Sequence, residues 1–129
     1  MDKDELRHRT KEFALRTMKL VDALPRSRSA NAVANQLVRS GTSVASNYRA
    51  ACRARSRAEF VAKIGVVEEE ADESAFWLEL VIGHKLMQEA MVRALLKEAD
   101  ELTAIMAASR ISASRNSKQS ALANRKSAI

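Results

Sequence analysis

Arginines are the residues of this 129-residue chain whose type and spacing could do chemistry. The guanidinium group is planar and permanently charged, so it can hold a phosphate through paired hydrogen bonds. Arg49 and Arg53 are four residues apart and would share one face of a helix. No aromatic residues alternate with these bases, as a single-strand stacking surface would need, and no helix-turn-helix is evident. The candidate nucleic-acid-binding residues are Arg39, Arg49, Arg53, Arg55, Arg57, Arg110, Arg115 and Lys118.

Charge is unevenly distributed along the chain, and this leaves two interpretations of the arginines open. Residues 1–58 hold 13 Lys and Arg against 5 Asp and Glu, residues 59–108 hold 4 against 11, and residues 109–129 hold 5 against none. The arginines could bind RNA or DNA, or they could pair with the acids of the middle segment, within or between subunits. The acid-free end of the chain cannot neutralise itself, which favours nucleic acid.

The acidic cluster in the middle of the chain lacks the pattern of a metal site. Helical di-metal sites need a Glu-x-x-His pair on each of two helices, and only Glu5 and His8 provide one. The sequence therefore predicts no metal and no other cofactor, and a solvated or salt-bridged acidic face instead. The members of the cluster are Glu68, Glu69, Glu70, Asp72 and Glu73.

Cys52, the single cysteine, has no arrangement around it that marks a nucleophile. No catalytic Ser/His/Asp order, glycine-rich phosphate loop or CxxC motif accompanies it, so the sequence predicts a protein that is not an enzyme. A lone cysteine fits a reducing cytosol. The N-terminal residues MDKDELRHRT form no apolar signal core, and no run of ~18 apolar residues occurs. We therefore expect a cytoplasmic protein without membrane contact.

The elements that must position these residues are predicted to be long helices. The chain has only three glycines and one proline, and it is rich in strong helix formers. Apolar stripes of helical period indicate helices over about 4–24, 29–53, 57–82 and 87–108, in an antiparallel up-down-up-down four-helix bundle that fills residues 1–109. Met91 and Val92 are expected in the core of the last helix. Residues 110–129 have no sustained stripe and are expected to form a basic, flexible, largely disordered tail.

Residues at the helix ends support these boundaries. Pro25 should stop the first helix, and Ser29 is a suitable N-cap for the second. Ser56 and Glu59 have the spacing of a capping box, and Gly83 is a suitable C-terminal cap for the third helix. Gly41 lies inside the second helix among small residues, which indicates close packing against a neighbouring helix.

Several large apolar residues fall off the main stripes. Trp77 aligns by heptads with Lys63 and Glu70 rather than with the core, and Phe76 is one position further round. A large aromatic on a charged flank is either a rim residue of the core or an anchor at a subunit interface. A homo-oligomer is therefore expected. The candidate interface residues are Leu15, Met18, Phe76 and Trp77.

Three stretches resemble a known family. They are ELRHRTKEFALRTMKLVDALP (5–25), NQLVRSGTSVASNYRAACRARSRAEF (35–60) and KIGVVEEEADESAFWLELV (63–81). The chain resembles, to about residue 105, the four-helix-bundle proteins encoded in intervening sequences of bacterial 23S rRNA genes. That family commonly has Glu where this chain has Ala50, so helix 29–53 is more basic here.

The resemblance implies an antiparallel four-helix bundle assembled as a ring-like homopentamer. The chain is also similar to the accessory variability protein of diversity-generating retroelements, a basic pentamer that binds nucleic acid and a reverse transcriptase. By that likeness the basic positions would be Arg39, Arg49, Arg53, Arg55 and Arg57. The leading hypothesis is a non-enzymatic, cytosolic, homo-oligomeric accessory protein that binds RNA or DNA. The alternative is a structural or protein-interaction scaffold whose arginines pair with acids of helix 57–82.

Overall fold

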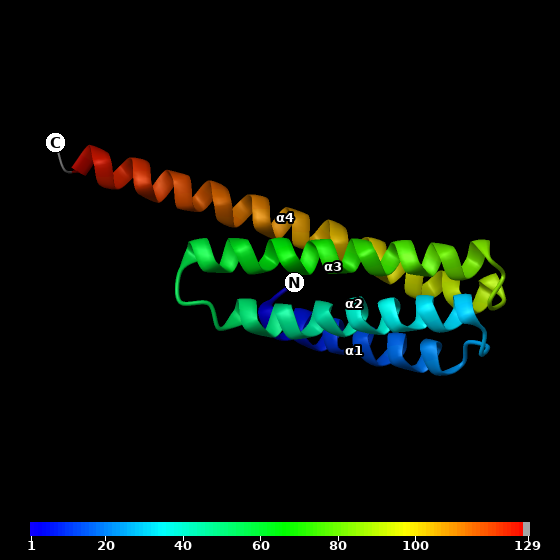
Figure 1. The fold of residues 1–129 in the computed structure, drawn as a ribbon. Helices are drawn as coiled ribbons and strands as arrows, with labels where there is room; N and C mark the ends of the chain where they lie inside the picture. Colours follow the sequence, from blue (N-terminus) through cyan, green and yellow to red (C-terminus); the bar gives the residue numbers. More distant parts are fainter. Residues whose placement is uncertain (128–129) are drawn as a thin grey trace.

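The computed structural model describes residues 1–127, and over that range its only regular secondary structure is helical. Its helices are α1 (Lys3–Asp22), α2 (Arg28–Cys52), α3 (Arg57–Gly83) and α4 (Glu89–Ser127) (Figure 1). The predicted antiparallel four-helix bundle is confirmed. Within these residues no helix combines the length and hydropathy needed to cross a membrane. Six side chains of α4 are not described by the structure: those of Ser117, Lys118, Ser120, Ala121, Lys126 and Ser127.

Each helix packs mainly on the next one in the chain, and α1 and α4 touch along a shorter seam. Arg9 of α1 holds that seam through hydrogen bonds of 2.7 and 2.6 Å to the two carboxylate oxygens of Glu98, and one of 2.7 Å to Glu101. These bonds favour the ionised carboxylate and hold the pKa of Glu98 below its usual range.

The core follows the predicted stripes closely. Its largest fully buried side chains include Phe13, Leu37, Ile64, Leu78 and Leu102. Each comes from a helical repeat of apolar residues, which places one face of every helix inside the bundle.

Met91 is an exception, because its side chain is 62% exposed. It lies at the edge of the α4 stripe, on an open groove beside Leu20 of α1 and Ala23, the residue that caps the end of α1. The expectation that Met91 belongs to the core is therefore wrong, while its neighbour Val92 is fully buried.

Serine side chains begin two of the helices. The Ser56 hydroxyl accepts the Glu59 N–H at 3.1 Å, as the capping box predicted, but the Glu59 carboxylate accepts from the N–H of Arg55, one residue earlier than expected. Ser27, not Ser29, caps α2, because its hydroxyl accepts the backbone N–H three residues later at 3.2 Å. The helix therefore starts within the first residues after the turn at Pro25.

The end of α3 differs from the predicted glycine cap. The left-handed residue is Lys85, with φ 54°, and Gly83 is still helical. The N–H of Leu86 donates to the carbonyl of Val81 at 3.0 Å, and the N–H of Lys85 to that of Ile82 at 3.0 Å. These are the paired bonds of a Schellman motif, so the helix end is satisfied two residues later than expected.

Gly41 of α2 lies in close contact with Thr17 of α1. A β-carbon placed on Gly41 would lie 2.6 Å from Cγ2 and 2.9 Å from Cβ of Thr17, which is fully buried. Both distances are far shorter than van der Waals contact. The predicted close packing at Gly41 is therefore confirmed.

The last helix is longer than predicted, because α4 does not end near residue 108 but continues to Ser127. The prediction relied on the loss of an apolar stripe, and the last fully buried core residue is indeed Met106. However, no glycine or proline follows Gly83, so no residue interrupts the helix. Residues 109–127, which we call the α4 extension, project past the connection between α2 and α3 (Figure 1).

Candidate nucleic-acid interface

A cationic groove runs between α1 and α2. Arg7 and Lys11 contribute from α1, and Arg49 and Arg53 contribute from α2. The groove has a volume of about 450 Å³, and no acidic residue lines it. Its remaining lining residues are Thr42, Ala45 and Ser46.

Helical spacing and small side chains create this groove. Each helix supplies two cations four residues apart, which lie about one turn apart on the same face. The close approach of α1 to α2 at Gly41 keeps the two pairs near each other. All four cationic side chains belong to exposed residues. The result is a row of solvent-facing positive charges on a rigid two-helix support.

The cations of the groove are largely free to bind an anion. Among the described residues, no acid forms an ion pair with Arg49, Arg53 or Lys11. Arg7 pairs with the exposed Asp4 of its own helix, and that contact raises the pKa of Arg7. An exposed pair of this kind contributes little stability, so a phosphate can compete for it.

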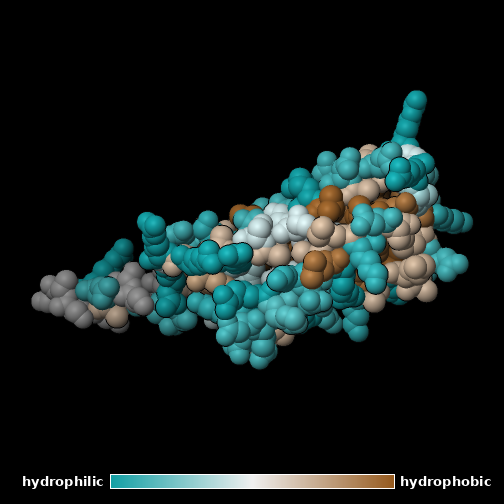
Figure 2. Space-filling view, turned by 90° about the horizontal axis from the view of Figure 1, so that it is seen from below, coloured by the Kyte–Doolittle hydropathy of each residue, from teal (hydrophilic) through white to brown (hydrophobic). Residues whose placement is uncertain are grey.

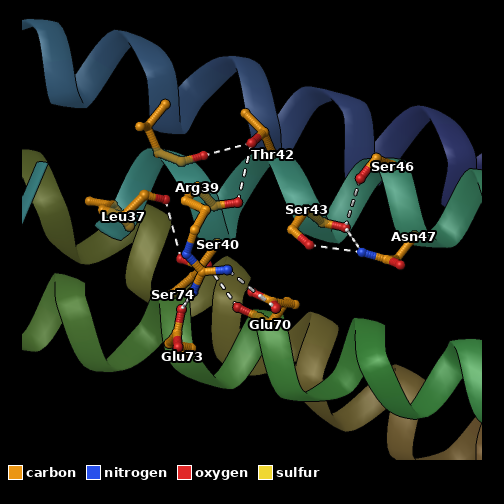
Figure 3. A network of polar contacts seen from close by, with 11 residues as sticks. Leu37, Arg39, Ser40, Thr42, Ser43, Ser46, Asn47, Glu70, Glu73 and Ser74 are labelled. Atoms are coloured by element: carbon orange, nitrogen blue, oxygen red, sulfur yellow. Dashed lines mark hydrogen bonds and ion pairs between the residues drawn. The ribbon is translucent and has the colours of Figure 1, made fainter. Parts of the chain in front are cut away.

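Arg39 lies in a different environment from Arg49 and Arg53. It extends to α3, where it forms an ion pair with Glu73 and a second one with Glu70, at 3.6 Å between Nη1 and Oε1 (Figure 3). The other carboxylate oxygen of Glu70 is buried without a hydrogen-bond partner. The positive charge of Arg39 therefore balances the carboxylates of Glu70 and Glu73. Arg39 does not line the groove between α1 and α2.

Next to Arg39, a hydroxyl pair joins α2 to α3 inside the core. Ser74 and Ser40 lie 2.8 Å apart between their oxygens, and each is fully buried. Each hydroxyl has one proton to donate. When Ser74 donates to Ser40, Ser40 donates to the carbonyl of Leu37, and the Ser74 hydroxyl can instead donate to the carbonyl of Glu70 (Figure 3). The small residues of α2 thus serve packing on two sides, toward α1 and toward α3.

The remaining predicted arginines lie at one end of the bundle. Arg55 and Arg57 are exposed where α2 connects to α3, and neither forms an ion pair with a described residue. Arg57 and Lys3 line a second cavity of about 380 Å³, which Ala113 of α4 also borders. This cavity brings the start of α1, the α2–α3 connection and the α4 extension together.

The predicted cations of α4 divide into paired and unpaired residues. Arg110 Nε donates to Glu68 Oε1 at 2.7 Å, and this contact raises the pKa of Arg110. Arg115 is exposed and forms no ion pair with any described residue. The side chain of Lys118 lies outside the described residues. Only Arg115 is therefore placed as a free cation among these three.

Sequence reasoning missed Arg7 and Lys11. They have the same four-residue spacing as Arg49 and Arg53, so the signal was present. Only the relative position of α1 and α2 shows that the two pairs face one groove.

The predicted interface residues are exposed apolar side chains on two separate helices. On α1, Leu15 and Met18 are 49% and 45% exposed, and on α3, Phe76 is 50% exposed. Trp77 is half-buried against the core, with its ring centroid 5.1 Å from that of Phe76, and its indole N–H is buried without a partner. Figure 2 views the molecule from the side of α1 and α2, and it shows apolar side chains gathered over the half that lies away from the C-terminus.

Among the side chains that the structure describes, no three His, Cys, Asp or Glu residues gather as a ligand set would.

The protein is an antiparallel four-helix bundle, and one groove on its surface is lined by four cations and no acid. Residues 3–108 match the family described as 23S rRNA-intervening sequence protein, and the chain belongs to that family. A crystal structure of a protein of unknown function from the S23 ribosomal protein family of Bacteroides thetaiotaomicron is similar, with a TM-score of 0.78 and 28% identity. The similarity covers 85% of this chain and 98% of that one. The comparison with curated proteins gave no match.

Proposed function

We propose that the protein is a non-enzymatic, homo-oligomeric protein of the cytosol that binds RNA or DNA through the α1–α2 groove. The observation that carries this proposal is the set of four exposed cations lining one groove without an acid. Arginine and lysine side chains on such a surface bind phosphate oxygens and release condensed counterions. Binding of this kind positions a nucleic acid without reading its sequence.

Salt dependence is the direct test of this proposal. Each phosphate contact changes the logarithmic salt slope by about −0.9, so four contacts predict a slope of about −3 to −4 per chain. Binding should weaken roughly a hundredfold between about 50 and 200 mM KCl. Fluorescence anisotropy of a labelled RNA hairpin measures both quantities. An absence of binding at about 50 mM KCl would overturn the proposal.

The alternative is a scaffold in which the arginines serve only protein contacts. Arg39 with Glu70 and Glu73, and Arg110 with Glu68, favour this alternative, because these pairs join helices of one subunit. The groove cations Lys11, Arg49 and Arg53 form no ion pair with described residues of their own chain, so this alternative requires them to pair with acids of another subunit. The scaffold alternative predicts that neutralising Arg49 and Arg53 changes the oligomeric state while no nucleic acid is bound by the unmodified protein.

Self-association is supported by the outer face of α3. This helix buries one stripe in the core, yet Val66, Phe76 and Leu80 are 37%, 50% and 38% exposed on its other side. A helix that is apolar on both sides is expected to be covered on both sides. A second copy of the chain would cover this face, and a ring of five is the assembly that the family resemblance implies.

Phe76→Glu is therefore expected to convert the oligomer to smaller species, because a charge would be buried at the contact. Light scattering coupled to size exclusion measures the mass at fixed protein concentration. Ala104→Glu is the matched control, since Ala104 is exposed on α4 away from the apolar residues of α3. An unchanged mass for the Phe76 variant would contradict an interface on this face.

A further inference from the structure

The α4 extension is a part of this chain that the bundle does not require. The last fully buried core residue is Met106, and the family match ends at residue 108. The last ion pair that ties α4 to the bundle is that between Arg110 and Glu68. At about 1.5 Å per residue, the extension reaches nearly 30 Å along its axis. Its 19 residues therefore add a surface that is separate from the core.

The extension carries positive charge only. Residues 109–129 contain five Lys and Arg and no Asp or Glu. Arg115 and Arg125 are exposed, and neither forms an ion pair with a described residue. Arg110 pairs with Glu68 of the bundle, whereas Arg115 and Arg125 have no acid in the extension to pair with and remain available to an external anion.

The extension begins beside other free cations. Ala113 borders the cavity that Lys3 and Arg57 line, so the extension leaves the bundle at the α2–α3 connection. Arg53, the residue that caps the end of α2, belongs to the groove and lies at this same end. Arg53 of the groove, Arg57 of the connection and the first residues of the extension thus lie at the same end of the bundle, and Figure 1 shows α4 running out past this end.

Among the described residues near the groove and this cavity, no aromatic side chain is fully exposed for stacking on unpaired bases. Tyr48 lies close to the groove but is 2% exposed, and burial raises the pKa of its hydroxyl. Phe60 is half-buried, with the Lys3 ammonium 5.5 Å from its ring centroid. Single-strand binding proteins depend on base stacking, whereas a duplex already stacks its bases and presents its phosphates outward.

We infer that the α4 extension is a basic arm that binds the backbone of double-stranded nucleic acid next to a duplex segment held in the α1–α2 groove. This inference rests on the proposed function and adds to it the duplex form of the ligand and a second contact region. The arm contributes phosphate contacts through Arg115 and Arg125, and it contributes no sequence readout.

The experiment compares two double variants of the full chain with equal loss of charge. Arg115→Gln with Arg125→Gln removes two arm cations, and Arg26→Gln with Arg28→Gln removes two exposed cations at the opposite end of α2. Anisotropy titrations use one labelled RNA strand, alone and annealed to its complement, over a series of KCl concentrations. Circular dichroism confirms that both variants stay helical.

The arm variant is expected to bind the duplex roughly tenfold or more weakly. The slope of its log affinity against log salt concentration should also become shallower by about 2. The control variant should stay within about twofold of the unmodified protein, because its cations lie far from the groove. The unmodified protein should prefer the duplex to the single strand. Equal effects of the two variants, or tighter binding of the single strand, would overturn this inference while leaving the proposed function intact. Failure of the unmodified protein to bind either form would overturn both.

Discussion

Replacing Arg49 and Arg53 together by glutamate is expected to weaken nucleic-acid binding by about a hundredfold or more. The variant loses two phosphate contacts, each of which contributes about −0.9 to the slope of log affinity against log salt concentration. The reversed charges also repel the neighbouring phosphates. Both side chains are exposed and form no ion pair with a described residue. The bundle should therefore keep its stability, and the loss of binding should not reflect unfolding.

The matched control for this variant is Arg26→Glu with Arg28→Glu. It changes the net charge equally, but at the turn between α1 and α2, away from the groove. Anisotropy with an RNA duplex at fixed salt should show a small loss for this control. If both variants lose affinity equally, net charge rather than the groove determines binding, and the assignment of the site is wrong.

The second large effect is expected at Gly41. Leucine at this position should prevent folding or remove more than about 3 kcal/mol of stability, because extra methylenes in a packed contact already cost about 1–3 kcal/mol. Alanine alone should cost about 1–3 kcal/mol, since its β-carbon would lie 2.6 Å from Thr17 Cγ2. Thr17 is fully buried and β-branched, so it cannot rotate away freely.

Gly65 offers a control with the same substitution in another helix. A β-carbon there would meet only Arg110 Cδ, at 3.7 Å, which is ordinary contact. Gly65→Ala should therefore stabilise the protein by up to about 1 kcal/mol through helix propensity. Urea unfolding followed by circular dichroism, at one protein concentration, compares the two variants. Equal stabilities for Gly41→Ala and Gly65→Ala would show that the α1–α2 contact tolerates a larger side chain.

The bundle could be predicted because periodicity and helix breakers act locally. The stripe that includes Leu37 and Val44 in α2 is regular, and Pro25 requires the first helix to end before it, as α1 does at Asp22. The end of α4 could not be predicted in this way, because a helix can continue without a core stripe when no breaker follows. At the end of α3 the left-handed residue is Lys85 and not Gly83, because the bonds that close this helix reach the carbonyls of Val81 and Ile82.

The candidate site could be predicted only in part. Arg39 and Arg49 are ten residues apart, which rotates them by about 80° from each other around the helix. The spacing therefore shows that they face different directions, but not that α3 lies beside Arg39 while α1 lies beside Arg49. The contribution of Arg7 and Lys11 depends on the same missing information, which is the position of one helix relative to another.

The order of the helices has a consequence for how the protein forms. Contacts between consecutive helices keep contact order low, and chains of low contact order fold quickly because little loop entropy is lost before contacts form. Every residue that lines the cationic groove precedes residue 54. During synthesis the groove can therefore take shape as soon as α1 docks on α2, whereas the basic arm is made last. The two parts of the binding surface are separated in time as well as in sequence.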